Sequence, residues 1–267
     1  GEVHRMAARL SGNFELKAGV FSSNPEKSAD FGKQLGISQD RLYNSYHEMA
    51  SREAALPADE RIDFVTVVTP NHLHFDVCKA FIEAGIHVVC DKPMTNTVAE
   101  ANELCKLVEE HDTIFALTHN YSGYPMVKEA KALVKDGKLG NLRKVVVEYS
   151  QGWLSHPIEE QGNKQAAWRT NPQKAGVSSV VADIGSHAEH LVEYITGQQL
   201  EKLYADIHTF VDGRALEDDA NMLVRYDNGL RGVLISSQIS IGEENGLRIR
   251  LYGDEASLEW KQEDPNY

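Results

Sequence analysis

A lysine and an aspartate–histidine pair are the side chains of this chain best suited to acid–base chemistry. Lys92 belongs to Asp91-Lys92-Pro93, which directly follows the apolar run 86–90. Burying an ammonium group is costly, so a lysine at the end of a buried strand usually has a partner or a task. Asp183 and His187 are four residues apart, a spacing that brings side chains together on one face of a helix. A carboxylate beside a histidine tunes a proton-transfer group toward neutral pH.

These groups suit the conversion of an alcohol to a ketone. The hydroxyl proton must leave as hydride leaves the carbon, and a histidine base can accept that proton. A lysine can stabilise the charge that develops on the oxygen. The residues alone also allow a simpler interpretation, in which Asp183 and His187 are polar residues at the start of an ordinary helix.

The first part of the chain alternates between strand and helix patterns. We expect strands at 14–21, 62–68, 86–90 and 113–117, and helices at 1–10, 25–35, 73–84 and 98–110. Asn24 and Thr97 are typical N-caps, and Gly36 and Gly85 are typical helix ends. Short connections between alternating elements predict a parallel, doubly wound sheet. Ligands of such sheets bind beyond the carboxyl ends of the strands, where Lys92 is expected.

The pattern changes after residue 122. A helix is expected over 124–135, followed by strands at 143–149, 203–211, 222–226, 230–240, 247–252 and 256–260. Asp227-Asn228-Gly229 is a strong hairpin signal. The predicted fold class is therefore α/β, with a Rossmann-type parallel sheet followed by an α+β domain that has a large, mostly antiparallel sheet. We expect a dinucleotide-binding domain over 1–122 and a substrate-binding and oligomerisation domain over 123–267.

The chain opens on a helical pattern. Val3, Met6 and Leu10 have helical spacing, and no strand or glycine-rich turn precedes them. A Rossmann unit begins with a strand and a Gly-x-Gly-x-x-Gly turn. We therefore expect the sequence to lack that strand and most of that turn, with Gly1 as the last glycine. By this argument the 267-residue chain binds cofactor poorly or folds badly by itself.

Composition narrows the classes of partner. A net charge of −13 argues against a nucleic-acid role, and no apolar run is long enough to span a bilayer. Cys78, Cys90 and Cys105 are odd in number and have no CxxC spacing. We expect them to be reduced structural thiols of a cytoplasmic protein.

Four blocks of the chain carry a family resemblance. They are Thr69-Pro70-Asn71-His72-Leu73-His74, Asp91-Lys92-Pro93, Trp168-Arg169 with Ala175-Gly176, and Asp183-Ile184-Gly185-Ser186-His187. In order and spacing they resemble the Gfo/Idh/MocA family of NAD(P)-dependent sugar and cyclitol oxidoreductases. Asp91 stands where this family usually has glutamate. Val177-Ser178-Ser179 stands where glycines are common, so we expect a different backbone course there.

The resemblance implies a catalytic set of Lys92, Asp183 and His187. His187 would be the acid/base, Lys92 would polarise the substrate oxygen, and Asp183 would bind hydroxyls or orient the set. His190 would be structural. The expected cofactor residues are Gly1, Ser22, Ser23, Lys27, Thr69, Pro70, Asn71, His74, Asp91 and Lys92. The expected substrate residues are Lys92, Asn120, Tyr121, Trp168, Arg169, Asp183 and His187.

The cofactor is expected to be NAD or NADP. A carboxylate usually ends the second strand of an NAD-binding domain, where it binds the ribose diol. Here that position reads Ser22-Ser23, and Lys27 is within reach of a 2′-phosphate. This arrangement resembles that of NADP-binding relatives and favours NADP. The alternative is that the serines only lead into a helix cap while NAD binds.

The implied activity is hydride transfer between nicotinamide and a secondary alcohol or ketone of a sugar, sugar acid or inositol. We expect a homodimer or homotetramer, formed through the open face of the second sheet, with no nucleic-acid or membrane partner. Two alternatives remain at this point. One is a non-catalytic regulator that binds NAD(P) or a sugar. The other is a metal-dependent sugar isomerase or hydrolase, with Asp183, His187 and His190 as ligands; we expect no metal.

Overall fold

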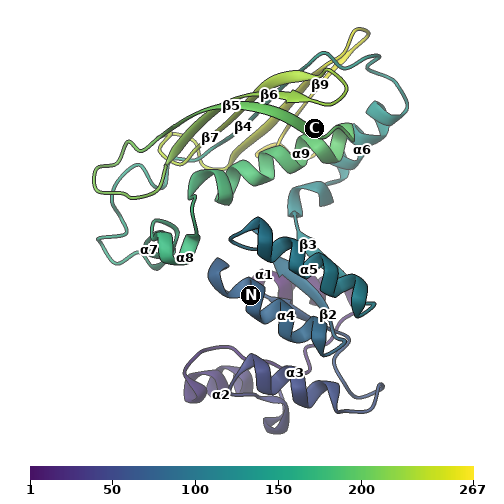
Figure 1. Cartoon of the computed structure of the whole chain (residues 1–267), viewed down its shortest axis with the longest axis vertical. Helices are drawn as coiled ribbons and strands as arrows, with labels where there is room; N and C mark the ends of the chain where they lie inside the picture. The colour runs from purple at the N-terminus through teal and green to yellow at the C-terminus, as the bar shows by residue number, and fades with distance from the viewer. The chain divides into compact units, whose positions relative to one another are not determined.

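The chain forms two compact units, each with its own hydrophobic core. The computed structural model describes residues 1–267 and divides into Gly1–Thr118 and His119–Tyr267 (Figure 1). One core cluster is drawn wholly from the N-terminal unit and the other wholly from the C-terminal unit. None of the helices combines the length and the hydropathy that a membrane span requires.

The N-terminal unit contains a three-stranded parallel sheet in the order β1-β2-β3. The strands are β1 (Phe64–Val67), β2 (His87–Asp91) and β3 (Phe115–Thr118). The crossovers contain α4 (His74–Glu83) and α5 (Val98–Glu110), as expected for alternating elements. The sequence prediction of a parallel Rossmann-type sheet is therefore confirmed.

Local signals set the helix boundaries of this unit. α1 (Glu2–Ser11), α2 (Pro25–Gln34) and α3 (Tyr46–Ala54) precede β1, and short 3-10 turns lie at Gln39–Arg41 and Asn71–Leu73. The Asn24 side chain accepts the Lys27 N–H at the start of α2, and Thr97 with Glu100 forms a capping box on α5. α4 is followed by Gly85 at φ 69°, a left-handed conformation that favours glycine.

The predicted strand at 14–21 is wrong. The segment forms a single parallel bridge between Gly19 and Leu42, where Gly19 exchanges hydrogen bonds with Arg41 and Tyr43. Phe14 and Leu16 are exposed. Alternation of apolar residues predicts a strand conformation but cannot supply the ladder partner that a strand needs.

The C-terminal unit contains a six-stranded sheet in the order β5-β6-β7-β4-β8-β9. Its strands are β4 (Lys144–Ser150), β5 (Leu200–His208), β6 (Asp219–Tyr226), β7 (Arg231–Ser237), β8 (Gly246–Tyr252) and β9 (Ser257–Lys261). All pairs are antiparallel except β4 with β7, which confirms the prediction of a large, mostly antiparallel sheet. Relative to the prediction, β5 lies three residues earlier and β7 ends at Ser237 rather than Ser240.

Helices cover one face of this sheet. α6 (Pro125–Lys135) and α9 (Ser186–Thr196) pack together, and their buried residues share a core with Met222 and Val224 of β6 (Figure 1). Side chains alternate across a strand, so Leu223 faces the opposite side and is 60% exposed. The shorter helices α7 (Lys164–Arg169) and α8 (Pro172–Ala175) lie in the connection between β4 and α9.

Each unit contains a buried carboxylate–arginine anchor. In the N-terminal unit the fully buried Glu53 carboxylate accepts hydrogen bonds from Arg41, Tyr43 and the Ile62 N–H. In the C-terminal unit Arg214 donates to Glu159 and Asp218.

Candidate active site

In the N-terminal unit, the candidate residues collect at the carboxyl ends of the parallel strands. Thr69 follows β1 and Lys92 follows β2. His74 ties these two loops together: its Nδ1 lies 2.7 Å from the Pro93 carbonyl oxygen and its Nε2 lies 2.8 Å from the Thr69 carbonyl oxygen. The His74 side chain is 1% exposed. Its ring thus fixes the loops that carry Thr69 and Lys92.

Asp91 joins three elements of the N-terminal unit. Its Oδ1 accepts hydrogen bonds from His4 Nε2 of α1 and from Thr118 Oγ1 of β3, each at 2.8 Å. Burial alone would raise the pKa of Asp91, but these hydrogen bonds outweigh burial and hold the pKa below its usual value. Sequence reasoning did not single out His4, because its partner is 87 residues away.

The residues at this edge fit a bound dinucleotide. The Thr69 hydroxyl is buried and has no hydrogen-bond partner, so it can take up a ligand group at the end of β1. The His4–Asp91 bond holds the first turn of α1 against the end of β2. A pyrophosphate binds at a helix N-terminus beside the carboxyl edge of such a sheet. Gly1 is the N-cap of α1 and precedes this first turn.

The segment at Ser22 forms a helix cap and carries no carboxylate. Ser22 Oγ accepts the Asn24 N–H, and Asn24 Oδ1 accepts the Lys27 N–H. Ser23 and Lys27 are exposed. The residues 22–25 therefore contain no negative charge that would repel a 2′-phosphate.

In the C-terminal unit, Asp183 is held by two donors on one oxygen. Arg169 Nε donates to Asp183 Oδ2 at 3.0 Å and Gln238 Nε2 donates to the same oxygen at 2.9 Å. The Arg169 guanidinium also stacks over the Trp168 ring at 4.2 Å. Two donors on one carboxylate oxygen fix the direction of that carboxylate.

The backbone that carries Asp183 differs from the predicted α-helix. Val181–Gly185 is a π-helix, and α9 begins at Ser186. The α-helical spacing argument for Asp183 and His187 therefore does not apply directly, because π-helical bonds span five residues rather than four. The helical propensities of the residues do not distinguish a π-helix from an α-helix.

Glu217 holds the segment before this π-helix. Its Oε1 accepts hydrogen bonds from Ser178 Oγ and from the N–H groups of Ser179 and Val181. Ser178 and Ser179 stand where we noted that glycines are common in the resembled family. The Ser178 hydroxyl gives the segment a side-chain hydrogen bond that a glycine could not provide.

Aromatic rings surround His187, whose side chain is 8% exposed. Its ring centroid lies 4.9 Å from Tyr121, 5.6 Å from His119 and 6.3 Å from Tyr149. His119 stacks on His190 with centroids 3.9 Å apart. Burial lowers the pKa of His190, which favours its neutral form near pH 7.

Two phenols continue the polar network beside His187. The Tyr121 and Tyr149 hydroxyls are hydrogen-bonded to each other, and Tyr149 also donates to Asn245 Oδ1. Burial, followed by the neighbouring Tyr121, raises the pKa of Tyr149. Tyr149 therefore stays protonated at neutral pH. Of this pair, the sequence pointed to Tyr121 only.

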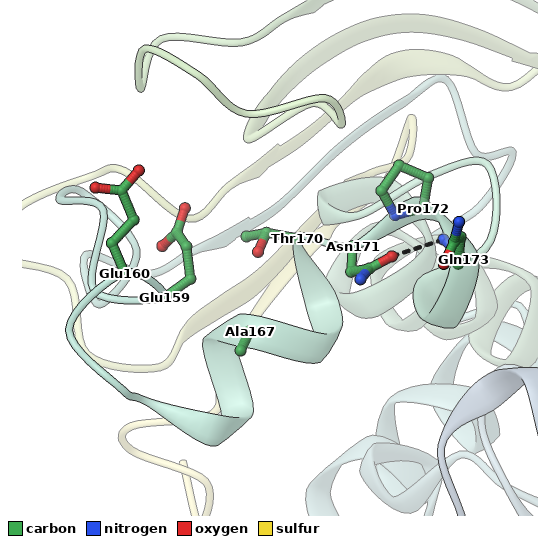
Figure 2. Close-up of a pocket in the computed structure, with 7 residues that line it drawn as sticks. All are labelled: Glu159, Glu160, Ala167, Thr170, Asn171, Pro172 and Gln173. Carbon is green, nitrogen blue, oxygen red and sulfur yellow. Dashed lines mark hydrogen bonds between the residues drawn. The ribbon is translucent and has the colours of Figure 1, made fainter.

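The predicted site residue Asn120 and a surface hollow near Glu159 lie apart from this network. Asn120 belongs to the 3-10 turn Asn120–Gly123 and is exposed. Figure 2 shows a surface hollow between Glu159 and Glu160 on one side and the α7–α8 corner on the other. Both Glu159 carboxylate oxygens are bound by Arg214. No three His, Cys, Asp or Glu side chains are grouped closely enough to hold a metal ion.

Sequence reasoning missed several polar residues of the C-terminal network. Gln238 directly follows β7 and is fully buried, like Ser236 and Ser237 before it. A run of polar residues at the end of an apolar strand is the same signal that pointed to Lys92, and it could have pointed to Gln238. Nothing comparable marks Asn245 in the sequence.

The fold and these two groups of residues define a nucleotide-dependent oxidoreductase, and comparison with known proteins identifies the family. Residues 1–119 match the oxidoreductase family with an NAD-binding Rossmann fold, and residues 127–259 match the GFO/IDH/MocA C-terminal domain. The chain therefore belongs to the GFO/IDH/MocA oxidoreductase family.

Individual relatives agree with this assignment. The uncharacterized oxidoreductase YfiI of Bacillus subtilis is 36% identical over 100% of this chain and 68% of its own length. scyllo-Inositol 2-dehydrogenase (NADP(+)) IolW of Bacillus subtilis is 27% identical over 75% of this chain and 52% of its own length. Among solved structures, an inositol dehydrogenase homolog from Azotobacter vinelandii complexed with NADH and myo-inositol has a TM-score of 0.91 at 36% identity, covering 99% of this chain and 67% of that chain.

Proposed function

We propose that this protein is an NAD(P)-dependent dehydrogenase that acts on a secondary alcohol of a sugar, sugar acid or inositol. The observation that carries the proposal is the Asp183 carboxylate, which Arg169 and Gln238 hold in a chain that matches both family domains. The complex of the inositol dehydrogenase homolog with NADH and myo-inositol supports the substrate class.

In this proposal Lys92, Asp183 and His187 form the catalytic set. The nicotinamide cofactor, when bound, supplies the hydride acceptor or donor. His187 takes the proton from the substrate hydroxyl during oxidation and returns it during reduction. The Lys92 ammonium stabilises the negative charge on the same oxygen. The Asp183 carboxylate accepts hydrogen bonds from hydroxyls, which are the groups that a polyol offers in number.

The residues proposed to hold the cofactor are Gly1, Ser22, Ser23, Lys27, Thr69, Pro70, Asn71, His74, Asp91 and Lys92. His74 and Asp91 contribute by fixing loops and helix α1. Tyr121, Trp168 and Arg169, with Asn120, are proposed on the substrate side. NADP is favoured over NAD, because no carboxylate lies at Ser22-Ser23 and the exposed Lys27 can pair with a 2′-phosphate.

Cofactor titration followed by a substrate panel tests the function. Quenching of tryptophan fluorescence by NADPH and NADH gives two Kd values, and the proposal predicts the tighter value for NADPH. Lys27→Ala should remove that preference. An NADH preference that survives Lys27→Ala would contradict the choice of NADP but not the proposed dehydrogenase activity.

Turnover is then measured with myo-inositol, scyllo-inositol and D-glucose, with NAD+ and NADP+. Reduction of the cofactor by any of these, lost in Lys92→Met and His187→Gln, supports a dehydrogenase. Tight cofactor binding with no turnover of the three compounds would instead favour a non-catalytic binding protein.

We also propose a homodimer or homotetramer that works in the cytoplasm. The outer face of the large sheet carries exposed apolar side chains. Tyr204 is 74% exposed, and Leu223, its partner in the strand register, is 60% exposed. All three cysteines are free thiols, Cys78 and Cys90 buried and Cys105 exposed, as in reducing compartments. Light scattering should show an oligomer that Leu223→Lys dissociates and that Val98→Lys, in the exposed start of α5, leaves intact.

A further inference from the structure

Gln238 is held rigidly at its backbone. It follows β7 and is fully buried. Its N–H donates to the Asp218 carbonyl and its carbonyl accepts the Leu154 N–H, each at 3.0 Å. The side chain therefore projects from a fixed point toward Asp183.

The direction of the Gln238 amide follows from its neighbours. Nε2 donates to Asp183 Oδ2 at 2.9 Å and to Gln151 Oε1 at 3.3 Å. A reversed amide would place its oxygen against the Asp183 carboxylate, which can only accept when ionised. The Gln151 amide is oriented in turn by Trp153, whose indole N–H can only donate and lies 3.1 Å from the same Oε1.

The same chain of hydrogen bonds continues to the residues around His187. Gln151 Nε2 donates to Asn245 Oδ1 at 3.1 Å. Asn245 Oδ1 also accepts from Tyr149, which is bonded to Tyr121. The rings of both tyrosines border His187. One connected network thus reaches from Asp183 to the side chains that enclose His187.

We propose that Gln238 is a positioning residue that aims the Asp183 carboxylate, with Gln151 and Trp153 setting the direction of its amide. Gln238 oxygen Oε1 is buried without a hydrogen-bond partner, so the side chain gives up one hydrogen bond in the orientation that serves Asp183. This inference rests on the proposed function, because Asp183 matters to the reaction only if the protein is that dehydrogenase.

The three tryptophans provide a test that needs neither cofactor nor substrate. Each indole N–H has a different partner: Trp153 bonds Gln151, Trp168 bonds Gln165 beside Arg169, and the buried Trp260 bonds the Pro265 carbonyl. Nitrogen–proton correlation spectra of the protein labelled with [15N]tryptophan should therefore show three indole signals. Trp260 serves as the internal control.

Asp183→Asn should move the Trp153 signal through Gln238 and leave the Trp260 signal in place. Arg169, which bonds Asp183, also lies 5.7 Å from the centre of the Trp153 ring and provides a second route. In the Gln238→Leu background the same Asp183→Asn change should therefore move the Trp153 signal less than in the parent, and an equal shift in both backgrounds would contradict the inference. If Asp183→Asn moves only the Trp168 signal, Gln238 does not couple Asp183 to Trp153 and the inference is wrong.

Kinetics on the best compound of the substrate panel provide the second test. Gln238→Leu should lower kcat roughly 10- to 100-fold, as expected for a misplaced reacting group, with little change in Kd for the cofactor. Gln238→Glu keeps the shape but replaces the donor, so it should lower kcat at least as much. If Gln238 acted through packing alone, Gln238→Leu should lower kcat more than Gln238→Glu does.

Gln198 supplies the matched control. It is also buried, and its Oε1 also lacks a partner, but it lies after α9 and bonds none of the network residues. Gln198→Leu should keep kcat within about twofold of the parent. If Gln238→Glu does not fold, Gln151→Met breaks the same network one bond further away and should give a smaller loss of kcat.

The two proposals fail in different ways. If Asp183→Asn leaves kcat unchanged, the proposed function is wrong. If Asp183→Asn lowers kcat while the Gln238 variants behave like Gln198→Leu, only the positioning role is wrong. If Gln238 acts through Asp183, Gln238→Leu should add no further loss to Asp183→Asn.

Discussion

Thr69 and Lys92 of the N-terminal unit and Asp183 of the C-terminal unit are held by different means. In the N-terminal unit, Thr69 and Lys92 stand at strand ends, and the His74 ring binds the loops through backbone carbonyls. In the C-terminal unit, Asp183 is held by side chains from two other segments, Arg169 and Gln238. Backbone topology places the first group, whereas a side-chain network places the second.

This difference has consequences for how the two sites respond to substitution. Around Thr69 and Lys92 one side chain, His74, contacts two backbone carbonyls, so its loss affects only the two loops that it joins. In the C-terminal unit each donor is itself oriented by another side chain, so one substitution alters several bonds. We expect conservative substitutions to cost more around Asp183 than around Lys92.

The largest effect is expected at His187. His187→Gln should lower kcat about 100- to 10 000-fold, the contribution typical of a positioned acid/base. The exposed His208 of β5 provides the control, since His208→Gln changes the same residue type in the same unit. If His187→Gln lowers kcat no more than His208→Gln does, His187 is not the acid/base.

The next effect concerns stability of the N-terminal unit. Glu53→Gln should lower the free energy of unfolding by about 3 to 5 kcal/mol, because the Arg41 guanidinium loses its buried partner. Urea unfolding measures the change, and Glu83→Gln on the exposed face of α4 is the control. If the units unfold separately, only the transition of the N-terminal unit should move; a shift of both would show that they depend on each other.

A smaller effect is expected at His74, which joins the loops that carry Thr69 and Lys92. His74→Phe removes both ring nitrogens, which lie 2.7 Å and 2.8 Å from the Pro93 and Thr69 carbonyl oxygens, and should weaken dinucleotide binding roughly 10- to 100-fold. The fluorescence titration measures this change, with the exposed His111→Phe as control. Affinity unchanged by His74→Phe would show that strand ends alone hold the cofactor loops.

The smallest effect is a pH dependence in the C-terminal unit. Burial, followed by the neighbouring Glu193, raises the pKa of Glu189 to about 7 from 4.5. The folded protein thus binds this proton more tightly than the unfolded chain does. The resulting stabilisation is present below about pH 4.5 and is lost as the pH rises through about 7.

Glu189→Gln cannot titrate, so its stability relative to the parent should increase between pH 5 and pH 8. The expected gain is about 1 to 2 kcal/mol, because partial exposure screens the charge. Urea unfolding at both pH values measures it, with the exposed Glu244→Gln as control. A gain of equal size at pH 5 would point to packing rather than protonation.

Local sequence signals predicted much of the fold. Caps at Asn24 and Thr97 and the glycine after α4 lie where the helices begin and end. Alternating elements and the hairpin at Asp227–Gly229 predicted the two kinds of sheet. The segment 14–21 was misassigned because a strand requires partners, which its own residues do not specify.

The sequence by itself determined the placement of Lys92, since a residue after a parallel strand must lie at the ligand-binding edge of the sheet. It also determined which residues of the C-terminal unit could act as acid or base. Only the tertiary structure decided how Asp183 is held, because Arg169 and Gln238 lie 14 and 55 residues away along the chain. Hydrogen bonds act over about 3 Å and are highly directional, so partners so distant in sequence are set by the packing of whole elements and by no local pattern.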